Sequence, residues 1–298
     1  MKVSVKYLGR FGNNLIQLFN AIILSYFFNN ELIYDLDTLK DGLLLNEDMY
    51  YRIFEFVTDN SRLNIQVVKQ MLKEYYPECN PYAFLRMSDT LILNNFYQQS
   101  AHLFKFRNIV LNSSPDQIVY YHNKFGDQAG MIGLKFSDLF QLHPQMTKED
   151  IIVHIRLGDF IKQPTHEKLL IIHPDFYINE INKFEGLSVL IVVEEPTEDV
   201  EKKYIQYILD RVNKDTKLQH SHLLNDWLTI RNAKYVIGSN STFCWSACYL
   251  NQRAERIVYP ETDYYPSQKL GECEERWRVE KLKIDNLINI NNFFLEDK

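Results

Sequence analysis

The chain has 298 residues, of which 46% are hydrophobic and 24% charged, and its formal net charge is −6. This composition is that of a folded globular protein and excludes a disordered one, and the length suits two domains of about 150 residues each. Acidic and basic residues are mixed along the chain. Because no lysine- or arginine-rich stripe is present, we expect no nucleic-acid partner and no strong binding to an anionic membrane surface.

Two features bear on where the protein works. The longest apolar stretch, residues 15–28, is interrupted by Gln17, Asn20 and Ser25, so it is too short and too polar to span a bilayer. The first residues contain no signal-type apolar region. We therefore expect a cytoplasmic protein with no transmembrane segment, which leaves room for peripheral association with the inner face of the plasma membrane.

In chain order, the first half begins with regular elements and then becomes irregular. A strand, a glycine turn, a helix and a second strand are predicted at residues 3–7, 9–13, 14–28 and 32–35. Between residues 41 and 145 polar and aromatic segments blur the pattern. The polar stretch 143–150 precedes a more regular region, so we place the domain boundary there and predict domains 1–147 and 148–298.

The second half alternates strands with helices. Apolar strands are predicted at residues 151–156, 187–193, around 218, 235–238 and 256–259. Helices are predicted at 174–183, from an N-cap at Thr197 to 212, at 224–233 and at 241–250. Such alternation indicates a parallel sheet covered on both faces, whose ligands bind beyond the carboxyl ends of the strands.

Three functional side chains follow one another where the first of these strands ends: His154, Arg156 and Asp159. Because side chains alternate along a strand, His154 and Arg156 are predicted to point to the same side. A guanidinium in this place suits a phosphate, which it can bind through two parallel hydrogen bonds. A purely structural pair of Arg156 and Asp159 is equally consistent with the pattern.

Two further segments resemble phosphate-binding turns. Residues 238–243 read Gly-Ser-Asn-Ser-Thr-Phe and lie between a predicted strand and a helix, where backbone N–H groups and hydroxyls can hold a phosphate. Ordinary N-capping explains the same residues. Gly9 and Gly12 permit close approach of a ligand, but the spacing lacks the third glycine of the dinucleotide fingerprint.

Taken together and in this order, these segments resemble the α-1,2-fucosyltransferase family, which is related more distantly to the α-1,6- and protein O-fucosyltransferases. The family's Gly-Gly-Leu-Gly-Asn-Gln-type turn, its His-x-Arg-Arg-Gly-Asp motif and its Asn-Ser-Thr-Phe-Ser-Trp-Trp-Ala-x-x-Leu motif are matched by residues 9–14, 154–159 and 240–250. The chain departs from the family at Leu157, which replaces the second arginine. It departs again at Cys244 and Ser246, which replace a serine and a tryptophan.

The resemblance implies the GT-B architecture, an α/β fold of two Rossmann-like domains with parallel sheets facing a cleft. It implies an inverting, metal-independent glycosyltransferase that moves L-fucose from GDP-β-L-fucose to a galactoside hydroxyl in an α-1,2 linkage. The implied partners are GDP-fucose and a β-galactoside acceptor, lipid-linked in the synthesis of bacterial surface glycans of the O-antigen type. The implied enzyme needs no cofactor.

The resemblance also assigns residues to the chemistry. Arg156 would neutralise the β-phosphate of the leaving group, and Asp159 would take the proton of the acceptor hydroxyl. His166 and Glu167, in the loop beyond, are alternative bases.

Donor binding is implied for a set of residues drawn from all three motifs and from the loop after the strand at 187–193: Asn13, His154, Arg156, Glu195, Asn240, Ser241, Thr242 and Phe243. Guanine presents two adjacent donors on its pairing edge, which a carboxylate can accept. We assign this role to Glu195, or else Glu194, beside His154.

Two alternatives stay open. Asp35-Leu36-Asp37 is a D-x-D pattern, which in another glycosyltransferase architecture binds a metal and a sugar diphosphate. The second alternative is a non-catalytic protein that binds a sugar nucleotide or a glycan, toward which the missing charge at Leu157 points.

Overall fold

The chain divides into two compact units, residues 1–141 and 142–298, close to the predicted boundary after residue 147. The computed structural model describes residues 2–5, 11–28, 31–32, 43–44, 84–87, 90–93, 103, 106–113, 118–122, 131–135, 139, 148–158, 161, 171–261, 279–283 and 287–288. The predicted arrangement of two domains across a cleft stays a prediction.

The first unit contains a five-stranded sheet with the order β2-β1-β5-β4-β3. Its strands are β1 (Lys2–Val5), β2 (Glu31–Leu32), β3 (Leu43–Leu44), β4 (Phe84–Met87) and β5 (Thr90–Leu93). β1 is parallel to β2 and β5, whereas β4 is antiparallel to β5 and β3. The all-parallel sheet predicted for this domain is therefore wrong. Two residues join β4 to β5, and so short a connection forms a hairpin, because parallel neighbours need a long crossover.

Among its described residues the first unit also contains α1 (Phe11–Phe28), α5 (Arg107–Leu111), and the antiparallel pair of β6 (Ile118–His122) and β7 (Met131–Lys135). The helix predicted from residue 14 begins earlier, at Phe11. Gly12 and Asn13 already lie in the first turn of α1, where the buried Phe11 and Leu15 anchor the helix.

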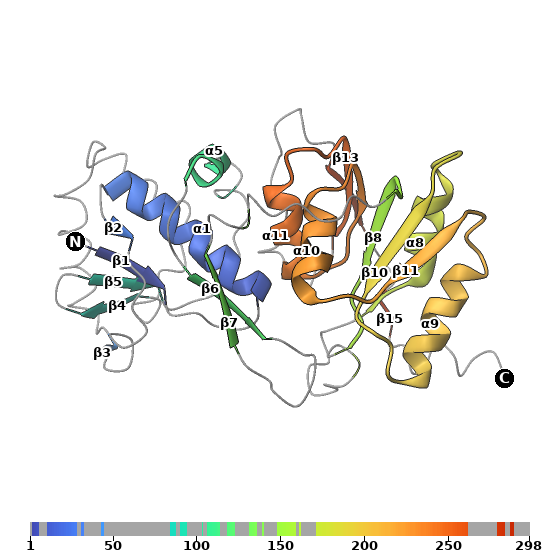
Figure 1. The fold of residues 1–298 in the computed structure, drawn as a ribbon, viewed down its shortest axis with the longest axis horizontal. Coiled ribbons are helices and arrows are strands. Elements are labelled where there is room, and N and C mark those ends of the chain that lie inside the picture. Colours follow the sequence, from blue (N-terminus) through green and yellow to red (C-terminus); the bar gives the residue numbers. More distant parts are fainter. Residues whose placement is uncertain are drawn as a thin grey trace. The chain divides into compact units, whose positions relative to one another are not determined.

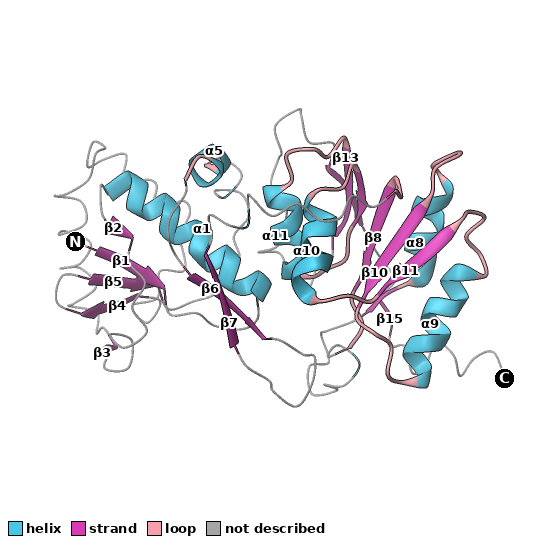
Figure 2. Cartoon of the chain, in the orientation of Figure 1, coloured by secondary structure: helices cyan, strands magenta, loops and turns pink. Residues whose placement is uncertain are grey.

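The second unit contains a six-stranded sheet in which all neighbours are parallel, ordered β11-β10-β8-β12-β13-β14 (Figures 1 and 2). Its strands are β8 (Ile151–Ile155), β10 (Val189–Val193), β11 (Thr216–Gln219), β12 (Tyr235–Ile237), β13 (Arg256–Glu261) and β14 (Val279–Lys283). The parallel sheet predicted for this half of the chain is confirmed. β14 was missed, because its sequence Val-Glu-Lys-Leu-Lys contains only two apolar residues.

The strand order of this sheet is that of the Rossmann fold. Numbered along the chain, its strands lie in the order 3-2-1-4-5-6, and the direction of the order reverses between β8 and β12. Ligands of such sheets bind in the crevice outside the carboxyl ends of the strands at this reversal. The sequence segments that follow β8 and β12 are therefore the first place to look for a site.

Helices cover both faces of this sheet (Figure 1). They are α8 (Pro174–Asn182) and α9 (Asp199–Leu209) on one face, and α10 (Leu223–Arg231) and α11 (Thr242–Leu250) on the other. Ser241 is the N-cap of α11, whereas the N-cap of α9 is Glu198 instead of the predicted Thr197. Beside the main sheet, β9 (Ile171–Ile172) pairs with β15 (Leu287–Ile288).

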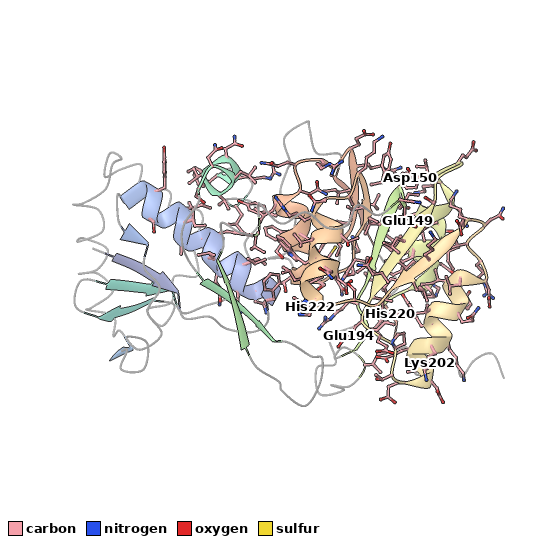
Figure 3. The ribbon with its side chains drawn as sticks, in the orientation of Figure 1. Glu149, Asp150, Glu194, Lys202, His220 and His222 are labelled. Carbon is pink, nitrogen blue, oxygen red and sulfur yellow. The ribbon has the colours of Figure 1, made fainter. Side chains whose placement is uncertain are left out.

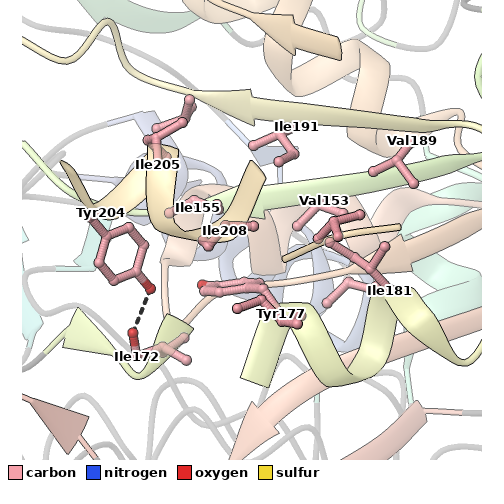
Figure 4. Close-up of a cluster of buried hydrophobic side chains, with 14 of the residues drawn as sticks. Val153, Ile155, Ile172, Tyr177, Ile181, Val189, Ile191, Tyr204, Ile205 and Ile208 are labelled. Carbon is pink, nitrogen blue, oxygen red and sulfur yellow. Dashed lines mark hydrogen bonds between the residues drawn. The ribbon is translucent and has the colours of Figure 1, made fainter. Parts of the chain in front are cut away.

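Alternate side chains of β8 belong to different faces of the sheet. Val153 and Ile155 pack with side chains of α8 and α9, such as Ile181 and Ile208, in one buried cluster (Figure 4). Within this cluster the hydroxyl of Tyr204 donates a hydrogen bond of 2.5 Å to the carbonyl oxygen of Ile172. That bond ties α9 to β9, which no periodicity in the sequence indicates.

Tyr204→Phe should lower the free energy of unfolding by about 1–3 kcal/mol, because the buried carbonyl of Ile172 loses its donor. Urea denaturation followed by circular dichroism measures the effect. Tyr207→Phe on the same helix is the matched control, since its hydroxyl lies 3.5 Å from the exposed Asp175, and it should change stability by less than about 0.5 kcal/mol. Equal effects of the two substitutions would contradict the structural role of Tyr204.

Candidate functional site

The loop that follows β12 reaches the end of β8. His154 is buried, and its Nδ1 lies 2.7 Å from the hydroxyl oxygen of Ser239, a residue 85 positions away. The ring of His154 also lies against Phe243, with 5.5 Å between the ring centroids. The histidine motif and the serine-threonine motif therefore meet where the strand order reverses.

Arg156 and Leu157 follow β8 and lie in different surroundings. Arg156 is half-buried, whereas Leu157 is buried in the cluster beneath α8 and α9 together with Val153 and Ile155. The leucine that replaces the family's second arginine thus continues the inward alternation of β8. At this position a hydrophobic core residue stands where the family has a charged one.

The amino end of α11 is held from two sides. The hydroxyl of Ser241 accepts a hydrogen bond from the N–H of Phe243 at 3.3 Å. The hydroxyl of Tyr259, on β13, donates to the carbonyl oxygen of Ser241 at 3.1 Å. Gly238 leaves room for this tyrosine, because a Cβ there would lie 2.8 Å from a ring carbon of Tyr259.

This helix end has the properties of an anion site. The first turn of α11 contains no acidic residue, and the partial positive charge of a helix N-terminus attracts phosphate groups. Asn240 and Ser241 are buried, whereas Thr242 and Phe243 are half-buried and remain accessible.

Ser246 connects α11 to α10. Its hydroxyl donates to the carbonyl oxygen of Phe243 at 2.9 Å and accepts a hydrogen bond from the indole N–H of Trp227 at 3.1 Å. The residue that departs from the family's tryptophan therefore braces the first turn of α11 from behind.

Cys244 and Cys248 are buried free thiols on α11. Burial raises the pKa of Cys244, but a hydrogen bond from Cys248 and the nearby His154 lower it by more. The same hydrogen bond, together with burial, raises the pKa of Cys248 well above its usual range. Cys248 therefore stays protonated, and its S–H donates a hydrogen bond to the sulfur of Cys244.

The loop after β10 carries the two predicted guanine-binding carboxylates, and both residues are exposed. A Cβ on Gly158 would lie 2.6 Å from Oε2 of Glu194, and the atoms nearest to that position all belong to Glu194. Figure 3 shows Glu194 at the carboxyl edge of the sheet, at the opposite end from Glu149 and Asp150, which precede β8. Glu194 therefore lies next to the turn that follows Arg156.

Asp226 is a residue of the site that the sequence analysis missed. It lies in the first turn of α10, only 8% of its surface is exposed, and its Oδ1 accepts hydrogen bonds from Gln219 at 2.7 Å and Ser221 at 2.5 Å. Burial raises its pKa, against opposing effects of these two partners and of the nearby His154. Its only signal in the sequence is an acid near the start of a predicted helix, which is an ordinary capping feature.

The other predicted residues belong to the first unit or fall outside the described part of the chain. Asn13 belongs to α1 of the first unit. The predicted bases Asp159, His166 and Glu167 and the acids Asp35 and Asp37 are outside the described residues. Within the described ranges, no cluster of three or more His, Cys, Asp or Glu side chains could hold a metal ion, and none of the helices is both long and apolar enough to cross a membrane.

The second unit is a Rossmann-type α/β unit, with a guanidinium and a helix N-terminus in the two segments at the reversal of its strand order. The chain belongs to glycosyl transferase family 11, whose match covers residues 3–283. The resemblance of the three motifs to a fucosyltransferase family is therefore confirmed.

The individual proteins that the chain resembles share only a small part of its sequence. The chain is 28% identical over 141 residues to the alpha-1,2-colitosyltransferase of Escherichia coli; the match covers 44% of this chain and 48% of that protein, so the chain spans about half the length of this relative. A crystal structure of POFUT1 in complex with GDP-fucose superposes with a TM-score of 0.43 and 9% identity, over 87% of this chain and 97% of that one. Arabidopsis thaliana FUT1 in complex with GDP gives a TM-score of 0.38 and 11% identity, over 88% and 71%.

The buried carboxylate of Asp226 should lower the free energy of unfolding at neutral pH. Because its folded pKa is raised above the ordinary value of 3.8, stability falls as pH rises from that value through the folded pKa. Asp226→Asn keeps an acceptor for Gln219 and Ser221 but removes the buried charge. The variant should therefore gain stability relative to the wild type as pH increases over this window.

Urea unfolding at a series of pH values between about 3 and 7 measures the difference. Asp199→Asn is the control, because the Asp199 side chain is 94% exposed and its substitution should show no such trend. A stability difference between Asp226→Asn and the wild type that does not vary with pH would contradict the raised pKa.

Proposed function

We propose that this protein transfers L-fucose from GDP-β-L-fucose to a hydroxyl of a β-galactoside, with inversion and formation of an α-1,2 linkage. The observation that carries the proposal is the 2.7 Å contact between His154 and Ser239 in a chain of glycosyl transferase family 11. This contact joins the segment carrying Arg156 to the segment that leads into α11. A guanidinium and a helix N-terminus at one edge of a sheet suit a nucleoside diphosphate.

In this proposal the protein neutralises the diphosphate without a metal. Arg156 binds the β-phosphate, and Ser241, Thr242 and the N–H of Phe243 hold the other oxygens beside Asn240. Each charge-assisted hydrogen bond of this kind is worth about 1.5–3 kcal/mol.

The guanine base is read by a carboxylate beside His154. The pairing edge of guanine offers an N–H and an NH₂ side by side, and a carboxylate has two oxygens to accept them. Glu195 or Glu194 takes this role, and the contact of Glu194 with Gly158 supports the second of them. Asp226 is a further candidate, because it is buried and close enough to His154 to interact electrostatically.

The proposed reaction is a direct displacement. The acceptor oxygen forms a bond to the anomeric carbon of fucose as the bond from that carbon to the β-phosphate oxygen breaks, and GDP leaves with the electron pair. Asp159 takes the proton of the acceptor hydroxyl, with His166 or Glu167 as the alternative bases. Arg156 stabilises the negative charge that develops on GDP.

We further propose a lipid-linked surface glycan of the O-antigen type as the acceptor, modified at the cytoplasmic face of the membrane. Colitose is a second candidate for the transferred sugar, favoured by the 28% identity to the alpha-1,2-colitosyltransferase. A screen of GDP-linked fucose and colitose against β-galactosides, with the linkage determined by NMR, distinguishes the two.

Arg156→Ala should lower the rate of fucose transfer by at least about 100-fold, because charge on the leaving group is no longer neutralised. The measurement is GDP release from GDP-fucose with a β-galactoside and EDTA. Arg211→Ala is the control, since Arg211 is exposed and lies over the ring of Tyr207 on α9. Wild-type turnover in Arg156→Ala would remove the phosphate role, and wild-type activity that requires added magnesium would favour the Asp35 and Asp37 alternative.

Inosine diphosphate lacks the 2-amino group of guanine, so the ratio of its Kd to that of GDP reports on the base-reading carboxylate. We expect the wild type to prefer GDP by about tenfold or more. The preference should collapse in one of Glu194→Gln, Glu195→Gln and Asp226→Asn and persist in the exposed control Glu185→Gln. A preference retained in all three variants would contradict a carboxylate as the guanine reader.

A further inference from the structure

A buried carboxylate joins the segments that follow β8 and β10. Glu201, in the first turn of α9, is only 2% exposed. Its Oε1 accepts the N–H of Gly158 at 3.1 Å. Its Oε2 accepts the N–H groups of Thr197 and Glu198 at 2.6 and 2.9 Å. Both oxygens are thus bound by backbone donors from two separate segments.

The turn at Gly158 depends on this carboxylate. Gly158 has a φ of +49°, so the chain turns sharply just after β8, where the buried N–H cannot remain without an acceptor. Arg156 is only two residues earlier. Holding the amide of Gly158 therefore fixes the point at which the chain leaves the sheet, and with it the position of the Arg156 backbone.

The same turn is contacted by the loop after β10. Oε2 of Glu194 lies 2.6 Å from the place where a Cβ of residue 158 would be. A side chain at this position would displace the Glu194 carboxylate. The turn is therefore enclosed by one acidic side chain from α9 and another from the loop that precedes it.

We infer that Glu201 is a positioning residue for the donor site: it holds the turn after β8, and Arg156 with it, against the loop after β10 before the nucleotide binds. The inference rests on the proposed role of Arg156 at the diphosphate. Capping α9 accounts for the bonds to Thr197 and Glu198 but not for the bond to Gly158, which lies 43 residues away. A site built in advance loses less free energy to ordering when its ligand binds.

Glu201→Gln tests the inference. An amide keeps one acceptor oxygen, but its NH₂ must face a backbone N–H, so the bonds to one of the two segments are lost. We expect the Kd for GDP, measured by calorimetry, to rise about tenfold. The KM for GDP-fucose should rise with it, and kcat should fall as well, because Arg156 also stabilises the charge that develops on GDP during transfer.

Glu180→Gln is the matched control. Glu180 is also a buried glutamate of the second unit, but it lies on α8 with Lys183 and, 3.9 Å away, Arg256 at the start of β13. Its substitution should leave the Kd for GDP within about twofold of the wild type, even if it lowers the free energy of unfolding as much as Glu201→Gln does. A similar loss of GDP affinity in both variants would reduce Glu201 to a general structural role and overturn the inference.

A double-mutant cycle tests whether Glu201 acts through Arg156. In the Arg156→Ala background, Glu201→Gln should change the Kd for GDP by less than about twofold, because the side chain that it positions is gone. A further tenfold rise in the Kd for GDP would mean that the two residues act independently, which contradicts the inference.

If Glu201→Gln does not fold, Gly158→Ala and its control Gly186→Ala test whether the turn after β8 must be held in place for GDP to bind. Both glycines have positive φ values, +49° and +68°, so alanine strains both turns, but nothing lies within 4 Å of a Cβ at Gly186. Gly158→Ala should raise the Kd for GDP by about tenfold and Gly186→Ala should not. Equal Kd values would overturn the inference.

The outcomes separate the two proposals. A wild-type protein that does not bind GDP contradicts the proposed function and the inference together. A wild type that binds GDP and keeps its affinity in Glu201→Gln contradicts the inference alone.

Discussion

The parallel pairing of β8 with β12 is the constraint on which the candidate site depends. The register sets Ile151 opposite Tyr235 and Val153 opposite Ile237, so the two strands end at the same edge of the sheet. The chain must leave the sheet at both ends, and the two departing segments are neighbours because the strand order reverses there. The contact between His154 and Ser239 follows from this register.

Polar contacts behind the site hold these segments in place. Tyr259 supports the carbonyl of Ser241, Ser246 links Trp227 to the first turn of α11, and Glu201 accepts the N–H of the turn after β8. A buried polar group is costly unless it is hydrogen-bonded, so each of these contacts favours one arrangement of the loops. The residues proposed to touch the donor are therefore positioned by others that need not touch it.

The departures from the family motifs lie in the interior. Leu157 extends the cluster beneath α8 and α9, Cys244 shares a hydrogen bond with Cys248, and Ser246 binds Trp227. Each of these residues thus takes part in packing or hydrogen bonding within the sheet and its helices. The accessible positions of the third motif, Thr242 and Phe243, keep the family's residues.

Local patterns in the sequence determined most elements of the second unit. The strand predicted at 151–156 is β8 (Ile151–Ile155), and the capping chemistry of Ser241 marked the start of α11, because periodicity and caps depend on residues close in the chain. The three motifs were likewise sufficient to recognise the family. Only the tertiary structure decided that β4 and β5 form a hairpin in a mixed sheet, that β14 extends the parallel one, and which distant groups meet. Glu201 and Gly158, or Asp226 and His154, become neighbours through strand order and register, and no pattern local to either residue encodes that order.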